Sequence, residues 1–404
     1  MSVNTMNFEQ VSTVLTAIVK QATNQAVTAP VDTSSFVSVA QIGLSAGKDR
    51  VMNAISNIVS RTLFAIRPLI ETMPGLDIDT FRWGAIMRKL SICDNDWQND
   101  PAYAWPALYD SSHTGHETGD GYSIDPWTIK KPNLLETNIF GESVYFDEMS
   151  IFEDQLETAF TGPEQLASLL SLIMTNLANR LAMSNMGLKH GLLANAAAAI
   201  KAENNSERNI HLLTEYNTLT GETFTLADIY HPDNFGGFIK WAYSRIAQIT
   251  KEFQEYSTKY QTVISGKPVV RSTPLEFQKV YLLNPLLQQV SARVLADTYH
   301  ENFLTMADVE AVTYWQSLKN PEQVQAKPTY TKASDGSVVV GSNTTVSNVA
   351  GLIFDRDCMG MTILDRRVLS TPLNTKGLYR NLHVHCKQRV VFDSTEKCAL
   401  LTLD

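Results

Sequence analysis

The sequence predicts an α+β fold organised around one very long helix. Three observations support this prediction. Residues 161–201 repeat apolar side chains at spacings of three and four, two strand-like segments enclose the polar stretch within 82–147, and the residues after 349 form short β-like runs. The chain has 404 residues, of which 44% are hydrophobic. It is therefore long enough to build more than one core.

The first 47 residues are expected to form an N-terminal arm. The arm begins with an amphipathic helix over residues 7–24, whose apolar stripe is Phe8, Val11, Val14, Leu15, Ile18 and Val19. The following stretch, up to residue 47, is rich in Thr, Ser, Ala and Val and contains Pro30, so we expect it to be extended. A second helix is predicted from Asp49 to about Ser60, and it leads into a β-like segment at 62–67.

Residues 82–147 are predicted to form a long hairpin-like projection. The segment 84–92 alternates apolar and polar residues, and Glu142–Phe146 is the expected return strand. The segment between the two strands is too polar to form a hydrophobic core of its own. It nevertheless contains large aromatic side chains that need a surface to pack against. A neighbouring copy of the chain is the natural surface. The expected interface residues are Trp97, Trp105, Tyr109, Tyr122 and Trp127, together with Phe8 from the first helix.

The strongest helix signal begins at Thr161-Gly162-Pro163-Glu164, where a capping spacing is combined with proline in the first turn. The apolar repeat continues towards Lys201, and about 38 residues at roughly 1.5 Å each would span on the order of 55 Å. A compact mixed domain is expected next, with a helix at about 234–256, a strand at 279–283, a helix after Pro285 and a turn at 333–337. The chain then ends in strands at 349–354, 360–364, 382–392 and 399–403.

Composition excludes several classes of function. The net charge is −9, and no run of basic residues could neutralise several phosphates in a row, so direct nucleic-acid readout is not expected. The four cysteines are scattered, which fits a reducing cytosol and encodes neither a zinc site nor a disulfide framework. No export signal or membrane span is indicated.

The most specific enzymatic pattern is Gly43-Leu44-Ser45-Ala46-Gly47, which matches the G-x-S-x-G nucleophile elbow. That elbow needs preceding strands, whereas the residues before Ser45 are mostly expected helix and arm. A serine hydrolase using Ser45 is kept as the alternative function, and small residues in an arm are the preferred account.

The sequence patterns that could indicate a metal site are less specific than the G-x-S-x-G pattern. The Asp94–Asp100 segment lacks the glycine and glutamate of a calcium loop, and His113 and His116 lie in the polar projection without a helix to align them. His383 and His385 lie on one face of a strand, but no further ligand stands at a suitable spacing. We therefore expect no metal, no cofactor and no catalytic residue.

The order of elements, together with several short segments, resembles a known family. The segments are Arg82-Trp83-Gly84-Ala85-Ile86, Phe354-Asp355-Arg356-Asp357, Thr371-Pro372-Leu373-Asn374 and Gly377-Leu378-Tyr379-Arg380-Asn381. They are similar to capsid proteins of short-tailed and gut-associated phages, and the whole chain resembles the HK-ninety-seven-type fold of tailed-bacteriophage major capsid proteins.

The resemblance implies a division of the chain into six parts. These are an N-terminal arm (1–47), an arm-to-loop helix and strand (48–81), an extended loop (82–147), a peripheral domain with its spine helix (148–207), an axial domain (208–370) and C-terminal strands that return to the peripheral domain (371–404). Nothing places an acceptor beside Lys130 or Lys131, so no cross-link between subunits is expected.

The same resemblance implies a structural, non-enzymatic role. The expected function is self-assembly through pentamers and hexamers into an icosahedral shell around double-stranded DNA, which is packaged without sequence readout. The implied partners are identical subunits, a scaffolding protein, a portal and decoration proteins, with no membrane. The implied location is the virion capsid, assembled in the host cytoplasm.

Overall fold

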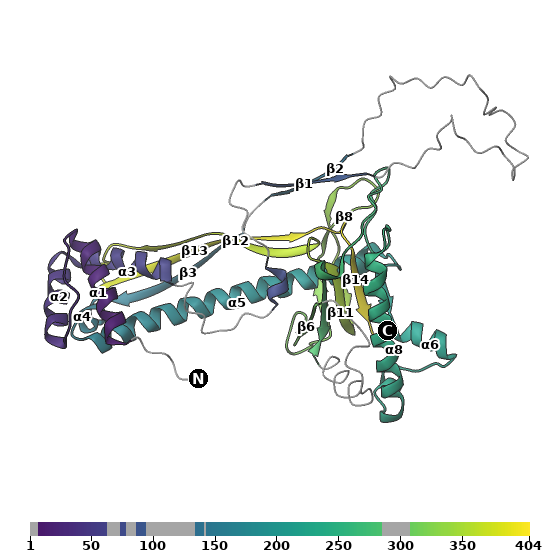
Figure 1. Cartoon of the computed structure of the whole chain (residues 1–404), viewed down its shortest axis with the longest axis horizontal. Coiled ribbons are helices and arrows are strands. Elements are labelled where there is room, and N and C mark those ends of the chain that lie inside the picture. The colour runs from purple at the N-terminus through teal and green to yellow at the C-terminus, as the bar shows by residue number, and fades with distance from the viewer. Residues whose placement is uncertain (1–6, 63–72, 78–85, 94–133, 141–142, 285–307) are drawn as a thin grey trace, which may run out of the picture.

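The computed structural model describes residues 7–62, 73–77, 86–93, 134–140, 143–284 and 308–404. Its dominant element is helix α5 (Pro163–Glu203), whose 41 residues span about 60 Å. Figure 1 shows α5 running through most of an elongated molecule, with a helical lobe at one end and a sheet lobe at the other. The predicted α+β class and the predicted long helix are both confirmed.

The helical lobe combines short helices with a three-stranded sheet that lies alongside α5. Its elements are α1 (Phe8–Thr23), α2 (Thr33–Ser45), α3 (Lys48–Thr62), β3 (Ser143–Phe152), α4 (Glu153–Ala159), β12 (Met359–Ser370) and β13 (Tyr379–Phe392). The strand order is β12-β13-β3, and both pairings are antiparallel. Segments more than 200 residues apart in the chain therefore share this sheet.

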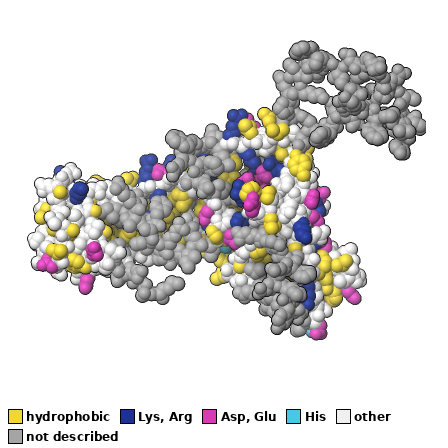
Figure 2. Space-filling view, in the orientation of Figure 1, with side chains coloured by type: hydrophobic (Ala, Val, Ile, Leu, Met, Phe, Trp, Pro, Cys, Tyr) yellow, Lys and Arg dark blue, Asp and Glu magenta, His cyan; other side chains and the backbone are white. Residues whose placement is uncertain are grey.

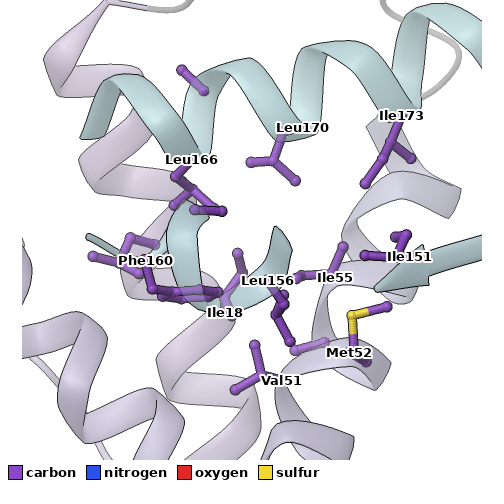
Figure 3. Close-up of a cluster of buried hydrophobic side chains, with 14 of the residues drawn as sticks. Ile18, Val51, Met52, Ile55, Ile151, Leu156, Phe160, Leu166, Leu170 and Ile173 are labelled. Carbon is purple, nitrogen blue, oxygen red and sulfur yellow. The ribbon is translucent and has the colours of Figure 1, made fainter. Parts of the chain in front are cut away.

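The core of the helical lobe forms where α1, α3, α4 and the first half of α5 meet. Figure 3 shows side chains from these helices and from β3 pointing into one cluster. The labelled members are Ile18, Val51, Met52, Ile55, Ile151, Leu156, Phe160, Leu166, Leu170 and Ile173, all at most 3% exposed. Val368, Leu382 and Val384 belong to the same cluster, so the inner face of the sheet also packs here.

The predicted extended arm is wrong for residues 33–45, which form helix α2. Asp32 caps this helix by accepting a hydrogen bond from the Ser35 amide at 2.8 Å. Phe36, Val39 and Ala40 are buried in the helical core. Tertiary packing thus outweighs the low helix propensity of a Ser- and Val-rich stretch. The leading segment consequently buries much of its apolar surface within its own chain.

The sheet lobe is built on a five-stranded mixed sheet in the order β4-β14-β11-β5-β6. Its strands are β4 (Asn209–His211), β5 (Gln278–Leu283), β6 (Asp308–Val312), β11 (Val349–Asp355) and β14 (Cys398–Thr402), and its helices are α6 (Leu212–Thr220), α7 (Leu226–Ile229) and α8 (Pro232–Gln254). One face packs against the end of α5 and the other against α6 and α8.

Small elements complete the described sheet lobe. They are the 3-10 turns Pro74–Leu76 and Leu275–Phe277 and the paired strands β7 (Val324–Ala326) with β10 (Thr344–Val346) and β8 (Thr329–Thr331) with β9 (Val338–Val340). The predicted turn at 333–337 lies between β8 and β9, where Gly336 adopts a positive φ of 72°. The predicted helix after Pro285 and the β-like segment 62–67, beyond Thr62, lie outside the described residues.

The described part of the projection is a two-stranded antiparallel ribbon of β1 (Ile86–Ile92) and β2 (Leu134–Phe140). Strand β1 was predicted, but the predicted return strand at Glu142–Phe146 is wrong. The return strand is β2, and Ser143 onward belongs to β3, which pairs with β13 instead. The reason is that Met149 and Ile151 of β3 pack into the helical core, whereas Leu135 is the one buried position among the described side chains of β2.

The four predicted C-terminal strands are present, but they do not all return to the same lobe. Strand β13 joins β3 beside α5, while β14 pairs with β11 and β4 in the sheet lobe. The expectation that residues 371–404 return together is therefore wrong for β14. Its five residues are all buried, because one face of the five-stranded sheet packs against the end of α5 and the other against α6 and α8.

By length and composition alone, one helix among the described residues, α5, could cross a membrane. Its apolar side chains pack into the two cores described above, as those of a core helix do.

Candidate functional site

The outer face of the β12-β13-β3 sheet, which we call the outer sheet face, carries a group of exposed apolar side chains. Even-numbered residues of β3 point away from the helical core, because the odd-numbered Ile151 and Met149 point into it. Val144, Phe146 and Phe152 are therefore 55%, 49% and 50% exposed, and Leu369 of β12 is 55% exposed. Leu378, just before β13, is 53% exposed.

The centre of the outer sheet face is Phe146, which lies between two histidines of β13. Its ring centroid is 5.3 Å from that of His383 and 5.1 Å from that of His385. Residues 383 and 385 were predicted to share one face of a strand, and this is confirmed. His383 Nδ1 lies 3.9 Å from the Glu148 carboxylate. Among the described residues, no group of three His, Cys, Asp or Glu side chains is placed to hold a metal ion.

Charges on the outer sheet face are few and locally paired. Arg367 donates to Asp365 at 2.8 Å on the same strand, and Ser150 donates to Asn381 at 2.7 Å across strands. Figure 2 shows hydrophobic side chains scattered over the described surface in that view. A surface that combines exposed apolar side chains with polar groups is typical of protein interfaces.

The β1–β2 ribbon carries a second, smaller apolar patch on the side that faces away from the body. Ile92 and Leu134 are direct cross-strand partners, 67% and 49% exposed, and Leu90 beside them is 55% exposed. Arg88 and Glu136 form an ion pair of 2.7 Å on the same side. The hydrogen bond from Arg88, followed by that from Asn138, lowers the pKa of Glu136 and outweighs the opposing effect of burial.

The structure does not place Ser45 as a nucleophile. Ser45 is the last residue of α2, and α3 follows it, so the local order is helix–turn–helix instead of the strand–turn–helix of a nucleophile elbow. Its hydroxyl donates to the Ile42 carbonyl at 2.7 Å. Lys48, two residues after Ala46, pairs with Glu153 at 3.1 Å and with Glu157. These residues hold α3 against α4 and do not form a catalytic group.

The predicted interface aromatics are only partly testable. Trp97, Trp105, Tyr109, Tyr122 and Trp127 lie outside the described residues, as do the Asp94–Asp100 segment, both projection histidines and the two projection lysines. Phe8 is described, and at 36% exposure it begins α1. It lines a hollow of about 790 Å³ between α1 and α5, together with Val11, Pro163 and Leu172. Its role in an interface stays a prediction.

The outer sheet face was missed at the sequence level except for its two histidines. Residues 143–147 were assigned to the projection and residues 148–152 to the peripheral domain, so Val144, Phe146 and Phe152 were not linked to β12 or β13. The alternation of apolar and polar residues on both strands was the available signal. It could not reveal the pairing, since β3 and β13 are separated by more than 200 residues.

No family model and no curated protein matches the chain. Solved structures do show similarity. The capsid structure of Staphylococcus phage Andhra is 11% identical, with a TM-score of 0.48, over 84% of this chain and 88% of that one. The cyanophage P-SCSP1u capsid is 12% identical, with a TM-score of 0.42, over 83% and 90%. The bacteriophage PhiM1 mature capsid is 10% identical, with a TM-score of 0.41, over 83% and 87%. The chain is thus similar to phage capsid structures, as the sequence predicted.

Proposed function

We propose that this chain is a structural subunit that assembles with identical copies into a closed icosahedral shell, as a tailed-phage major capsid protein does. The observation that supports the proposal best is the outer sheet face. A monomer that kept Val144, Phe146, Phe152 and Leu369 in water would expose apolar area that the surfaces of soluble monomers rarely leave uncovered. Covering this area with another copy removes the cost and joins two subunits.

The shape of the molecule supports the same proposal. The two lobes are held at a fixed separation by α5 and by the long strands β12 and β13 beside it. The outer sheet face and the apolar patch of the β1–β2 ribbon are therefore both attached to one elongated body. Many modest contacts distributed over such a frame add up to a stable assembly when each subunit has several neighbours. A catalytic role would instead call for convergent polar groups in a cleft.

The finer parts of the proposal follow from the resemblance stated for the sequence. Pentamers and hexamers of the chain would form the shell around double-stranded DNA, and the chain would have no enzymatic role. The part of the predicted projection that precedes Ser143 would lie over a neighbouring subunit, with Trp97, Trp105, Tyr109, Tyr122, Trp127 and Phe8 at interfaces. A scaffolding protein, a portal and decoration proteins would be partners. The shell would assemble in the host cytoplasm and become part of the virion. The domain boundaries given above belong to this proposal with two corrections: the extended loop ends before Ser143, where β3 begins, and β14 lies in the sheet lobe.

Replacing Phe146 with aspartate is expected to prevent assembly, because a carboxylate would be placed at the centre of the outer sheet face, where a neighbour would have to desolvate it. We expect the wild-type protein, when concentrated, to form rings or particles visible by electron microscopy, and the Phe146→Asp protein to sediment as a small species. The expected loss of particles is at least tenfold.

The matched control is Phe146→Leu, which keeps an apolar side chain at the same exposed position and should still assemble. Because Phe146 is half exposed, neither change should greatly alter thermal stability. Wild-type protein that remained a monodisperse monomer at high concentration and in the presence of crowding agents would contradict the proposed function.

A further inference from the structure

The β1–β2 ribbon is attached to the body by a buried group of charges that involves one ribbon side chain, Lys89. Lys89 Nζ lies 2.8 Å from Asp393 Oδ2 and also pairs with Glu396. The side chains of the two acids are only 2% and 6% exposed, and that of Lys89 is 20% exposed. In the view of Figure 2, basic and acidic side chains gather just below the ribbon. We call Lys89, Arg271, Asp393 and Glu396 the latch.

The body side of the latch is largely satisfied without the ribbon. Arg271 NH1 pairs with Glu396 at 2.7 Å, and its Nε donates to the Thr395 carbonyl at 3.0 Å. Asp393 Oδ1 accepts from the Thr395 amide at 3.0 Å and from the Thr395 hydroxyl at 2.6 Å. If Lys89 withdrew, Asp393 and Glu396 would therefore keep partners, and the ammonium group would enter water, where it is well solvated.

The remaining contacts between ribbon and body are limited. Arg271 NH2 donates to the Ser91 hydroxyl at 3.2 Å. One small apolar cluster joins Cys93 and Leu135 of the ribbon to Ile264 and Val269 of the body. A hollow of about 280 Å³ separates other parts of β2 from the body, and it is lined by residues 136–138 and by Ile264, Lys267 and Asp335. Among the described side chains of the ribbon, this is the one apolar cluster shared with the body.

The pKa directions agree with this geometry. Burial would raise the pKa of Asp393, but the charge and hydrogen bond of Lys89, together with the hydrogen bonds from Thr395, outweigh burial and lower it. Burial would lower the pKa of Lys89, and the two acids outweigh burial and raise it. The ion pair between these two groups is therefore strong in its buried setting, although Lys89 is the member that can leave.

We propose that the latch is a conformational device that allows the β1–β2 ribbon to be released as a unit while the rest of the molecule stays folded. The ribbon is a two-stranded element, which is marginally stable when it has no further support. One charged side chain holds it down, and the acids that receive this side chain have other partners on the body. The inference does not depend on what the chain assembles into, since it concerns one subunit.

Hydrogen–deuterium exchange of the full chain, followed by mass spectrometry, tests the latch. In Lys89→Met, amides in 86–92 and 134–140 are expected to exchange roughly 100-fold faster than in the wild type, because loss of the buried ion pair leaves the ribbon with few contacts. Amides of β13 and β14 are expected to change by less than about threefold. Glu396→Gln, which removes one of the two charges that face Lys89, should give an intermediate acceleration confined to the same two segments.

The matched control is Arg88→Met, which changes the adjacent residue on the opposite side of the ribbon. Its ion pair with Glu136 is largely exposed, so exchange in β1 and β2 should stay within about threefold of the wild type. Unchanged ribbon exchange in Lys89→Met would overturn the proposal. So would equal acceleration in β13 and β14, or a Lys89→Met protein that fails to fold, because either result would make Lys89 part of the global core.

Discussion

An Arg208→Met protein is expected to lose about 3–5 kcal/mol of unfolding free energy, because it leaves a buried carboxylate without its cation. Arg208 is fully buried, and its NH1 pairs with Glu203 at 2.5 Å and donates to the Thr262 hydroxyl at 2.8 Å. Its Nε donates to the Cys398 carbonyl at 3.2 Å. The residue therefore ties the end of α5 to strand β14, and urea denaturation followed by circular dichroism measures the loss.

The control for Arg208→Met is the double variant Glu203→Leu with Arg208→Met, which removes both charges. Replacement of a buried pair by apolar groups is often close to neutral, so the double variant should recover much of the lost stability. Lowering the pH should also recover part of the stability that Arg208→Met loses. Burial raises the pKa of Glu203 despite the opposing effect of Arg208, and removal of Arg208 raises it further. The folded single variant then binds a proton more readily than the unfolded chain, so its deficit should shrink as the pH falls from 7 towards 5. A double variant as unstable as the single one would contradict this account.

The long helix was predictable because all its signals are local. Pro163 occupies the first turn, the apolar residues recur at helical spacing, and Asn204 ends the helix in the left-handed region at a φ of 52°. Helix α2 was not recognised because its Ser, Thr and Val residues favour other structures when taken alone. Its signals were the cap at Asp32 and the spacing of Phe36, Val39, Ala40 and Gly43, which gain their energy only when α1 and α3 are present.

The candidate site was less predictable than the fold because it depends on distant pairings. The two histidines on one face could be read from β13 by alternation, but the Phe146 ring between them comes from a strand more than 200 residues earlier. The latch shows the same limitation. Lys89 lies on the face of β1 opposite to that of Arg88 and Leu90, and the sequence does not show which of the two faces is exposed to water. The acids that contact Lys89 lie about 300 residues later. Periodicity identifies faces of elements, and only the tertiary arrangement decides which faces meet.

The middle of α5 connects two cores that share few apolar contacts with each other. Residues up to Ala178 belong to the helical core, and residues from Leu192 onward belong to the core of the sheet lobe. Between them, polar contacts hold the helix to the neighbouring sheet: Arg180 pairs with Asp147 at 2.6 Å, and the Gln388 amide donates to Asn185 at 2.5 Å. The relative position of the lobes therefore depends on the continuity of the helix, together with the strands β12 and β13 that run beside it.

Met183→Pro is expected to destabilise the protein by about 3 kcal/mol or more and to abolish the proposed assembly, because proline removes a hydrogen bond in the helix interior and collides with the preceding turn. Met183 is 65% exposed in the middle of α5, so the change removes almost no packing, and its effect must come from the backbone. Met183→Ala is the matched control, since it truncates the same side chain but favours the helix, and it should keep both stability and particle formation. Urea denaturation and electron microscopy of the two variants measure the two effects separately. Normal particles from Met183→Pro would mean that the shell tolerates a kinked α5, and the idea that this helix fixes the distance between the interfaces would have to be abandoned.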